Sequence, residues 1–186
     1  MAHYRVAKRY AKGMMDFLAQ TGKEDVVMNE MKQLQELTSA NREFKTFLAS
    51  PVLDYKKKTQ ILRNILEPFS EETKTFLALI TRQGRSEAIG DIASEFIKLY
   101  KKNHKIKNAV ITSATPLSDD QIKAIVEKAK ASLPADTKIE VENKINPALI
   151  GGFILRLDDQ QFDASIKTKL NQIKKEFDSK HYIPKI

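Results

Sequence analysis

The residues from Val141 to Leu170 read VENKINPALIGGFILRLDDQQFDASIKTKL, and this stretch decides the fold class of the second half of the chain. In its opening part apolar and polar residues alternate, a pattern typical of a half-buried β-strand. Phe153 to Leu157 and Gln161–Phe162 predict two further strands, with a turn at Asp158–Asp159 between them. A closing helix is predicted by apolar residues at heptad-like spacing: Ile166, Leu170, Ile173 and Phe177.

The residues just before this stretch complete a small α+β domain. Ala109 to Ala114 is short and β-prone, and Thr115–Pro116 ends it. Ser118 and Gln121 form a capping box, which opens a helix with inward-facing apolar residues. We therefore expect residues 106–186 to form an α+β domain with a short sheet and two helices.

Residues 1–105 show a different pattern, with apolar residues at three- and four-residue steps in six successive segments. Thr21–Gly22 ends the first segment, and Asn41, Asp54 and Ser70 are candidate N-caps for later ones. The fold class is therefore predicted as α+β overall, with an N-terminal six-helix bundle over residues 1–105. The basic run from Lys98 to Lys107 has neither Pro nor Gly, which favours a helix continuing through the joint.

The composition excludes several classes of protein. The longest unbroken apolar run, Ala148 to Leu155, has 8 residues, far short of the ~20 that a membrane-spanning helix needs. The chain contains no cysteine, which excludes disulfides and thiolate chemistry. The first twenty residues lack the apolar run and cleavage site of a secretory signal. We expect a cytoplasmic protein.

No constellation of residues indicates catalysis. His3, His104 and His181 are far apart and lack the i, i+4 spacing of a zinc-binding helix. Adjacent carboxylates fall at predicted helix starts or in a turn, where the helix dipole and turn preferences account for them. Phosphate-loop and serine-hydrolase motifs are also missing from the sequence. We therefore expect no metal, no cofactor and no catalytic residues.

The net charge of +8 and the pI near 9.5 suggest a partner with negative charge. The charge is spread, however, with 19 basic and 13 acidic residues before residue 106 and 13 and 11 after it. The aromatic residues lie on the apolar stripes and do not alternate with lysines as stacking platforms. A protein-binding module and a basic RNA-binding adaptor remain as alternatives, and a steep salt dependence of binding would identify the second.

Several short motifs stand out along the chain: Ala7-Lys8-Arg9-Tyr10-Ala11, Phe47-Leu48 before Pro51, Phe76-Leu77-x-Leu79-Ile80 before Arg85, Asn143-Lys144-Ile145, Pro147, Leu149-Ile150-Gly151-Gly152, Arg156 and Asp163-x-Ser165. Through these motifs the sequence resembles the delta subunit family of rotary ATP synthases, to which the mitochondrial oligomycin-sensitivity-conferring protein is related. The resemblance covers essentially the whole chain in the right order. Two positions depart from the family pattern: Gly13 replaces a usual alanine, and Asn146 replaces a usual aspartate. No presequence precedes the matching first helix, which favours a bacterial protein over an organellar precursor.

The resemblance implies a non-catalytic stator subunit on the cytoplasmic face of the bacterial inner plasma membrane, attached to the membrane only through the complex. Its N-terminal domain is expected to hold N-terminal helices of the alpha subunits, and its C-terminal domain to join the b subunits. Proton flow would thereby stay coupled to ATP synthesis, and neither nucleic acid nor a homo-oligomer is expected. The groove residues carried over are Tyr10, Ala11, Met14, Phe76, Leu79 and Ile80. The candidates for b-subunit contact or for a structural role are Gly151, Gly152, Lys167, Lys174 and Lys175.

Overall fold

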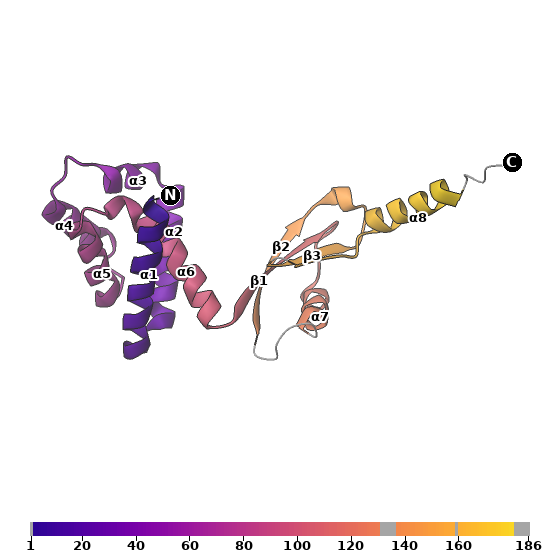
Figure 1. Cartoon of the computed structure of the whole chain (residues 1–186), viewed down its shortest axis with the longest axis horizontal. Helices are drawn as coiled ribbons and strands as arrows, with labels where there is room; N and C mark the ends of the chain where they lie inside the picture. Colours follow the sequence, from indigo (N-terminus) through magenta and orange to yellow (C-terminus); the bar gives the residue numbers. More distant parts are fainter. Residues whose placement is uncertain (1, 131–136, 159, 181–186) are drawn as a thin grey trace. The chain divides into compact units, whose positions relative to one another are not determined.

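The computed structural model describes residues 2–130, 137–158 and 160–180. The chain divides into two compact units, Met1–Asn103 and His104–Ile186, and each is described by itself. The described part of the first unit is helical, whereas the second combines helices with a four-stranded sheet (Figure 1). The predicted α+β class is therefore confirmed.

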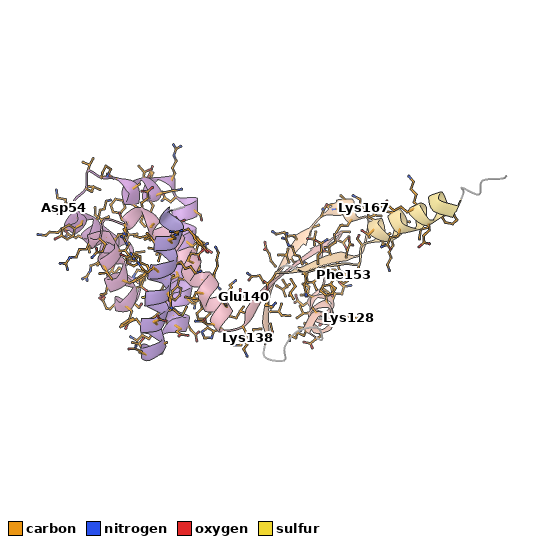
Figure 2. All side chains as sticks on the ribbon, viewed as in Figure 1. Asp54, Lys128, Lys138, Glu140, Phe153 and Lys167 are labelled. Atoms are coloured by element: carbon orange, nitrogen blue, oxygen red, sulfur yellow. The ribbon has the colours of Figure 1, made fainter. Side chains whose placement is uncertain are left out.

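Two helices of the N-terminal unit begin at side-chain caps that the sequence predicts. The Asn41 side chain accepts a hydrogen bond from the Phe44 N–H at 3.0 Å, and Ser70 Oγ accepts one from Thr73 N–H at 3.5 Å. Asp54, labelled in Figure 2, occupies the N-cap position of its helix, but its side chain makes no capping hydrogen bond. The elements are α1 (Ala2–Thr21), α2 (Glu24–Ala40), α3 (Arg42–Ala49), α4 (Tyr55–Ile65), α5 (Glu71–Arg82), the 3₁₀ turn Ser86–Ala88 and α6 (Ile89–Asn103).

The core of this unit lies where α1 and α2 pack against α6 (Figure 1). Phe96 of α6 is fully buried, as are Leu18 of α1 and Leu34 of α2. Gly90 lets α6 approach α2 closely, because a Cβ at that position would lie 3.0 Å from Thr38 Oγ1. The apolar stripes of the sequence thus form one shared interior, and α5 packs with α4 beside it.

A buried carboxylate ties α5 to α2. Glu30 accepts hydrogen bonds from the Ser70 N–H at 2.6 Å, Ser70 Oγ at 2.8 Å and Thr73 Oγ1 at 2.5 Å. These donors belong to the N-cap and first turn of α5, where backbone N–H groups lack helical partners and favour negative charge. The start of α5 is therefore fixed in position, which matters because α5 forms one wall of the groove described below.

The joint between the units is not the continuous helix that the sequence suggested. Helix α6 ends at Asn103, Lys105 has a positive φ of 52°, and strand β1 already begins at Ile106. A left-handed residue cannot continue a right-handed helix. Residues 106–113 instead pair with two other strands, and these long-range hydrogen bonds outweigh the local helix preference of the basic run.

The C-terminal unit is built around β1, which lies at the centre of a mixed sheet of order β2-β1-β3-β4. Strand β2 pairs with β1 in parallel, with Ala109 opposite Val141, whereas β3 pairs with β1 antiparallel, with Ile111 opposite Leu155. The elements are β1 (Ile106–Ser113), α7 (Asp119–Lys130), β2 (Lys138–Ile145), the 3₁₀ turn Pro147–Leu149, β3 (Phe153–Leu157), β4 (Gln160–Asp163) and α8 (Ile166–Lys180).

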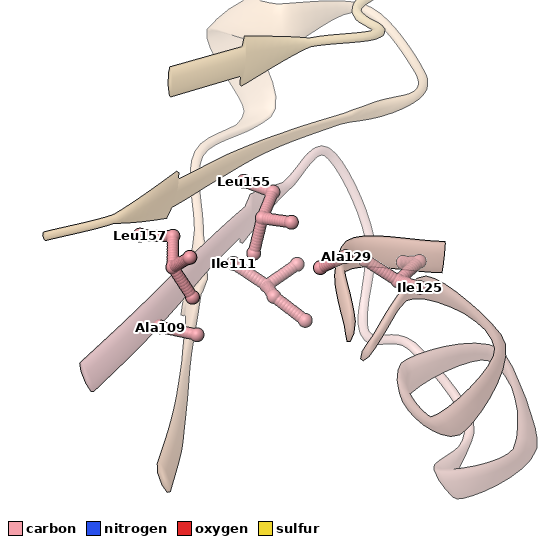
Figure 3. Close-up of a cluster of buried hydrophobic side chains, with 6 residues drawn as sticks. All are labelled: Ala109, Ile111, Ile125, Ala129, Leu155 and Leu157. Atoms are coloured by element: carbon pink, nitrogen blue, oxygen red, sulfur yellow. The ribbon is translucent and has the colours of Figure 1, made fainter. Parts of the chain in front are cut away.

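Helix α7 covers one face of this sheet and closes a small core (Figure 3). The predicted capping box is present, because the Ser118 N–H donates to Gln121 Oε1 at 3.0 Å and the Gln121 N–H donates to Ser118 Oγ at 3.4 Å. Asp158 follows β3 with a positive φ of 47°; Asp159, the second residue of the predicted turn, lies outside the described residues. The core consists of Ala109, Ile111, Ile125, Ala129, Leu155 and Leu157.

The start of α8 is fixed by the double-glycine segment. Ala164 N–H donates to Phe153 O at 2.9 Å, and Ile166 N–H donates to Gly151 O at 3.0 Å. Asp163 accepts hydrogen bonds from the Ser165 N–H at 2.9 Å and from Thr168 Oγ1 at 2.8 Å. The backbone N–H of Ser165 is the main cause that holds the pKa of Asp163 below its ordinary value. The motif therefore joins β3 to the first turn of α8.

Candidate protein-binding groove

An apolar groove of about 740 Å³ lies between α1 and α5. Arg9, Tyr10, Gly13, Met14 and Phe17 line it from α1, and Glu71, Glu72, Thr75, Phe76 and Leu79 from α5. The α1 members recur at three- and four-residue steps, so they share one helix face. The groove is an open, mainly apolar surface rather than a closed chamber.

Tyr10 is held in place by contacts from the facing α5 wall and from the segment after α5. Arg85 Nη1 donates to Tyr10 Oη at 3.1 Å, and the Arg85 guanidinium carbon lies 5.5 Å from the centre of the Tyr10 ring. The Tyr10 and Phe76 rings meet edge to face with their centroids 6.5 Å apart. Gly84, with φ 68°, ends α5 and lets the Arg85 N–H reach back to Ile80 O at 3.1 Å. This helix end therefore places Arg85 beside Tyr10.

The α5 wall carries acidic residues at its beginning. Glu72 forms an ion pair with Lys23, at 2.5 Å between Lys23 Nζ and Glu72 Oε1. The hydrogen bond from Lys23 is the main cause that lowers the pKa of Glu72 from its ordinary value. Glu71 pairs with Lys74 at 3.2 Å. The apolar floor thus has a charged rim, the arrangement usual for surfaces that bind proteins.

Two large apolar side chains remain exposed on facing walls of the groove. Phe17 is 50% exposed and Leu79 49% exposed, whereas Met14 and Phe76 between them are buried. Monomeric proteins rarely leave several large apolar side chains exposed to solvent in one patch of the surface. The groove therefore has a buried apolar floor and two half-exposed apolar side chains that an amphipathic segment would cover.

The structure brings together four of the six groove residues predicted from the sequence and separates two from the groove. Tyr10, Met14, Phe76 and Leu79 line it. Ala11 is 1% exposed and Ile80 0%, so both belong to the core of the unit. Phe17 and Gly13, which the prediction omitted, line the groove instead. Phe17 could have been found from its spacing, since it lies seven residues after Tyr10.

Gly13 leaves an open gap in the α1 wall. An alanine Cβ built there meets no heavy atom within 4 Å, and the residue lies in the middle of α1. We expect Gly13→Ala to raise the free energy of unfolding of the N-terminal unit by up to about 1 kcal/mol, because glycine lowers helix stability relative to alanine. Chemical denaturation followed by circular dichroism measures the change. A decrease would mean that the methyl group clashes, contrary to the open space found here.

The remaining predicted residues lie in the C-terminal unit and play two different parts. Gly151 and Gly152 pack under the start of α8, where a Cβ on Gly152 would lie 2.3 Å from Ala164 O. Lys167, Lys174 and Lys175 are exposed along α8, which Figure 2 shows with Lys167 labelled. The glycines thus have a structural role, and the lysines form a separate surface.

Neither unit assembles a metal site within its described residues. No group of three or more His, Asp or Glu side chains there could hold an ion. His181, one of the three histidines considered above, lies outside the described residues. In the described ranges no helix has both the length and the apolar character needed to cross a bilayer.

The fold and the groove define a two-unit α+β protein with an apolar groove on its helical unit. The sequence matches the family model for the ATP synthase delta (OSCP) subunit over residues 6–177, and the chain belongs to this family. The ATP synthase subunit delta of Flavobacterium johnsoniae is 34% identical, with 95% of this chain and 98% of that protein aligned. The subunit delta of Lactobacillus acidophilus is 32% identical, with 94% of this chain and 95% of that protein aligned.

A solved structure has the same fold. A chain in the cryo-EM structure of the Toxoplasma gondii mitochondrial ATP synthase hexamer superposes with a TM-score of 0.64 at 24% identity. The alignment covers 92% of this chain and 96% of that one. The resemblance noted in the sequence is therefore confirmed at the level of the family and of the fold.

Proposed function

We propose that this protein is the stator linker of a rotary proton-translocating ATP synthase, connecting the alpha/beta catalytic hexamer to the membrane-anchored b subunits. Membership of the delta (OSCP) family, which the family model shows over residues 6–177, supports this role. A linker of this kind resists rotation of the hexamer, so that proton flow drives ATP synthesis instead of turning the whole assembly. It carries out no bond chemistry of its own.

The observation that carries the proposal is the groove between α1 and α5. Its half-exposed Phe17 and Leu79, above a buried floor of Met14 and Phe76, suit an amphipathic helix that contributes residues at i, i+3, i+4 and i+7. We assign this groove to an N-terminal helix of an alpha subunit. Helices α1 to α6 would act as one six-helix bundle, corresponding to residues 1–105, that caps the hexamer.

The C-terminal unit, residues 106–186 in this assignment, joins the b subunits. The charge pattern of α8 and the absence of a membrane-crossing helix among the described residues suit a protein that reaches the membrane only through its partners. The site of action would be the cytoplasmic face of the bacterial inner membrane. Gly151 and Gly152 support the fold of this unit, while Lys167, Lys174 and Lys175 are the candidate contacts on its surface.

The family relationship does not favour an RNA-binding role, because the family model and the relatives are delta subunits of ATP synthases. Tyr10 and Phe76 contact each other in the groove, and Phe96 is fully buried, so these three aromatic residues are not stacking platforms beside exposed lysines. The excess of basic residues is better assigned to solubility and to steering toward acidic protein surfaces.

Reconstitution tests the proposed function. The full-length chain is added to membranes of the same organism whose ATP synthase has been stripped of its own delta subunit, and proton-driven ATP synthesis is measured. We expect the chain to bind the hexamer and to restore synthesis, while the ATPase activity of the detached hexamer stays unchanged. Tight binding to the hexamer without restored synthesis would contradict the linker role, and so would no binding at all.

A further inference from the structure

Helix α8 carries an apolar stripe that its own unit leaves exposed. Leu170 is 52% exposed, Ile173 50% and Phe177 67%, although each is an apolar residue on a three- or four-residue step. Ile166, at 45%, begins the stripe. The spacings of four, three and four residues are those of the a and d positions of a coiled coil. We refer to Ile166, Leu170, Ile173 and Phe177 as the α8 seam.

The core of the C-terminal unit does not need the α8 seam. Its buried cluster is closed by α7 against β1 and β3 (Figure 3). Ile166 lies against the double-glycine segment, since a Cβ on Gly151 would lie 2.5 Å from its Cδ1. Beyond this first turn, α8 extends away from the sheet (Figure 1). A row of exposed large apolar side chains marks a surface that is covered by another molecule.

The residues beside the α8 seam specify the charge of that molecule. With Ile166 and Ile173 at d and Leu170 and Phe177 at a, the flanking e and g positions are Lys167, Lys169, Lys174 and Glu176. Three of these four residues are lysines, and Lys169 and Lys174 have no ion-pair partner within the described part of the chain. Side chains at e and g select the partner of a coiled coil through charge.

A second copy of this chain fits the α8 seam poorly. In a parallel pair, the g position of one helix faces the following e position of the other. Lys169 of each copy would therefore face Lys174 of the other copy, which makes two lysine–lysine contacts. Like charges at such positions destabilise the pair. The charge pattern thus favours a different chain with acidic residues at its own e and g positions.

We propose that the α8 seam docks one amphipathic helix of another protein as a short two-stranded coiled coil, with Glu or Asp of that helix facing Lys169 and Lys174. This inference rests on the proposed function in one respect, namely that the helix would belong to a b subunit. It also changes which of the lysines on α8 are candidates for contact with the b subunit. Lys175 lies at position f, opposite the seam, and makes no contact in this arrangement, whereas Lys174 lies at its edge.

Neighbouring lysines provide a matched pair of variants. Lys174→Glu and Lys175→Glu change the same charge on adjacent exposed residues of one helix. We expect Lys174→Glu to weaken binding about five-fold or more at low salt, since an attraction becomes a repulsion, and Lys175→Glu to change it less than two-fold. Leu170→Ser should weaken binding at least ten-fold at any salt concentration, because it removes a seam residue.

The test uses the full-length chain and two probes, whose binding is measured by titration calorimetry. One probe is the soluble segment of the b subunit from the same ATP synthase. The other is a designed three-heptad peptide with Leu at a and d and Glu at e and g, compared with a version carrying Lys at e and g. Circular dichroism of each variant checks that α8 stays folded.

The outcomes separate this proposal from the proposed function. If the b segment binds and Lys174→Glu and Leu170→Ser weaken it while Lys175→Glu does not, both stand. If the b segment binds but none of these variants affects it, the seam proposal is overturned and the linker role survives. If only the acidic peptide binds, and binds through the seam, the docking chemistry stands but the b-subunit assignment fails. Binding of neither probe, or equal binding of the acidic and basic peptides, overturns the proposal.

Discussion

Replacing Gly152 with alanine is expected to destabilise the C-terminal unit by about 2–5 kcal/mol. Gly152 has φ 75°, where a side chain costs about 1–2 kcal/mol. Its added Cβ would also lie 2.3 Å from Ala164 O and 3.1 Å from Ser165 Cα. These are backbone atoms, so no change of rotamer relieves the clash, and overpacking of this kind costs about 1–3 kcal/mol more.

Two other glycines provide controls for the Gly152 prediction. Gly22 has φ 68° but open space around its Cβ position, so Gly22→Ala measures the backbone strain alone. In Gly151→Ala the new Cβ meets the end of the flexible Ile166 side chain, which can move. We expect both substitutions to lower the free energy of unfolding, measured by urea denaturation, by less than Gly152→Ala does. An equal decrease for Gly22→Ala and Gly152→Ala would show that the contact with Ala164 is unimportant.

The second large effect concerns the groove. Leu79→Asp is expected to weaken the binding of a peptide from the alpha-subunit N terminus by at least about a hundred-fold, or roughly 2.7 kcal/mol. Leu79 is half exposed in the free protein, so the aspartate stays hydrated there and the fold is preserved. In the complex the same carboxylate is buried among apolar groups without a partner, which is strongly unfavourable. Titration calorimetry with the full-length chain measures the loss.

The control for Leu79→Asp is Val26→Asp. Val26 is 52% exposed and lies outside the groove lining, in the first turn of α2, where an acidic residue suits the helix dipole. The affinity of the Val26→Asp variant for the peptide should stay within two-fold of the affinity of the unmodified protein. Met14→Asp would be a poorer probe, since Met14 is buried and its loss would also damage the helix packing. If Leu79→Asp and Val26→Asp bind equally well, the peptide does not occupy this groove.

Local signals in the sequence predict local features of the structure well. Asn41 and Ser118 act as the caps that their position before an apolar repeat indicates. Gly22 ends α1 with a positive φ, as glycine at a helix end usually does. Each of these features depends on hydrogen bonds within a few residues, so the sequence nearby contains the information.

Features decided by distant contacts were predicted less well. Ala11 and Ile80 lie on the same apolar stripes as Tyr10 and Leu79, but neighbouring helix residues differ by about 100° in direction. The packing of α1 against α6 turns Ala11 inward and Tyr10 toward the groove, and periodicity alone cannot choose between them. Strand β1 was predicted from Ala109 onward, but its start at Ile106 was missed for a similar reason, because its partners lie about 30 to 50 residues further along the chain.

The central position of β1 has a consequence for how the protein is made. Strand β1 ends at Ser113, but its antiparallel neighbour β3 is complete only at Leu157, 44 residues later. At synthesis rates of ~5–20 residues per second, the ribosome takes roughly 2–9 s to deliver those residues. The helical unit is complete at Asn103 and can fold meanwhile, whereas the nascent β1 presents two open edges and the apolar side chains of Ala109 and Ile111. Strand β1, which has a neighbouring strand on each side in the finished sheet, is therefore the segment that most needs protection from aggregation during biosynthesis.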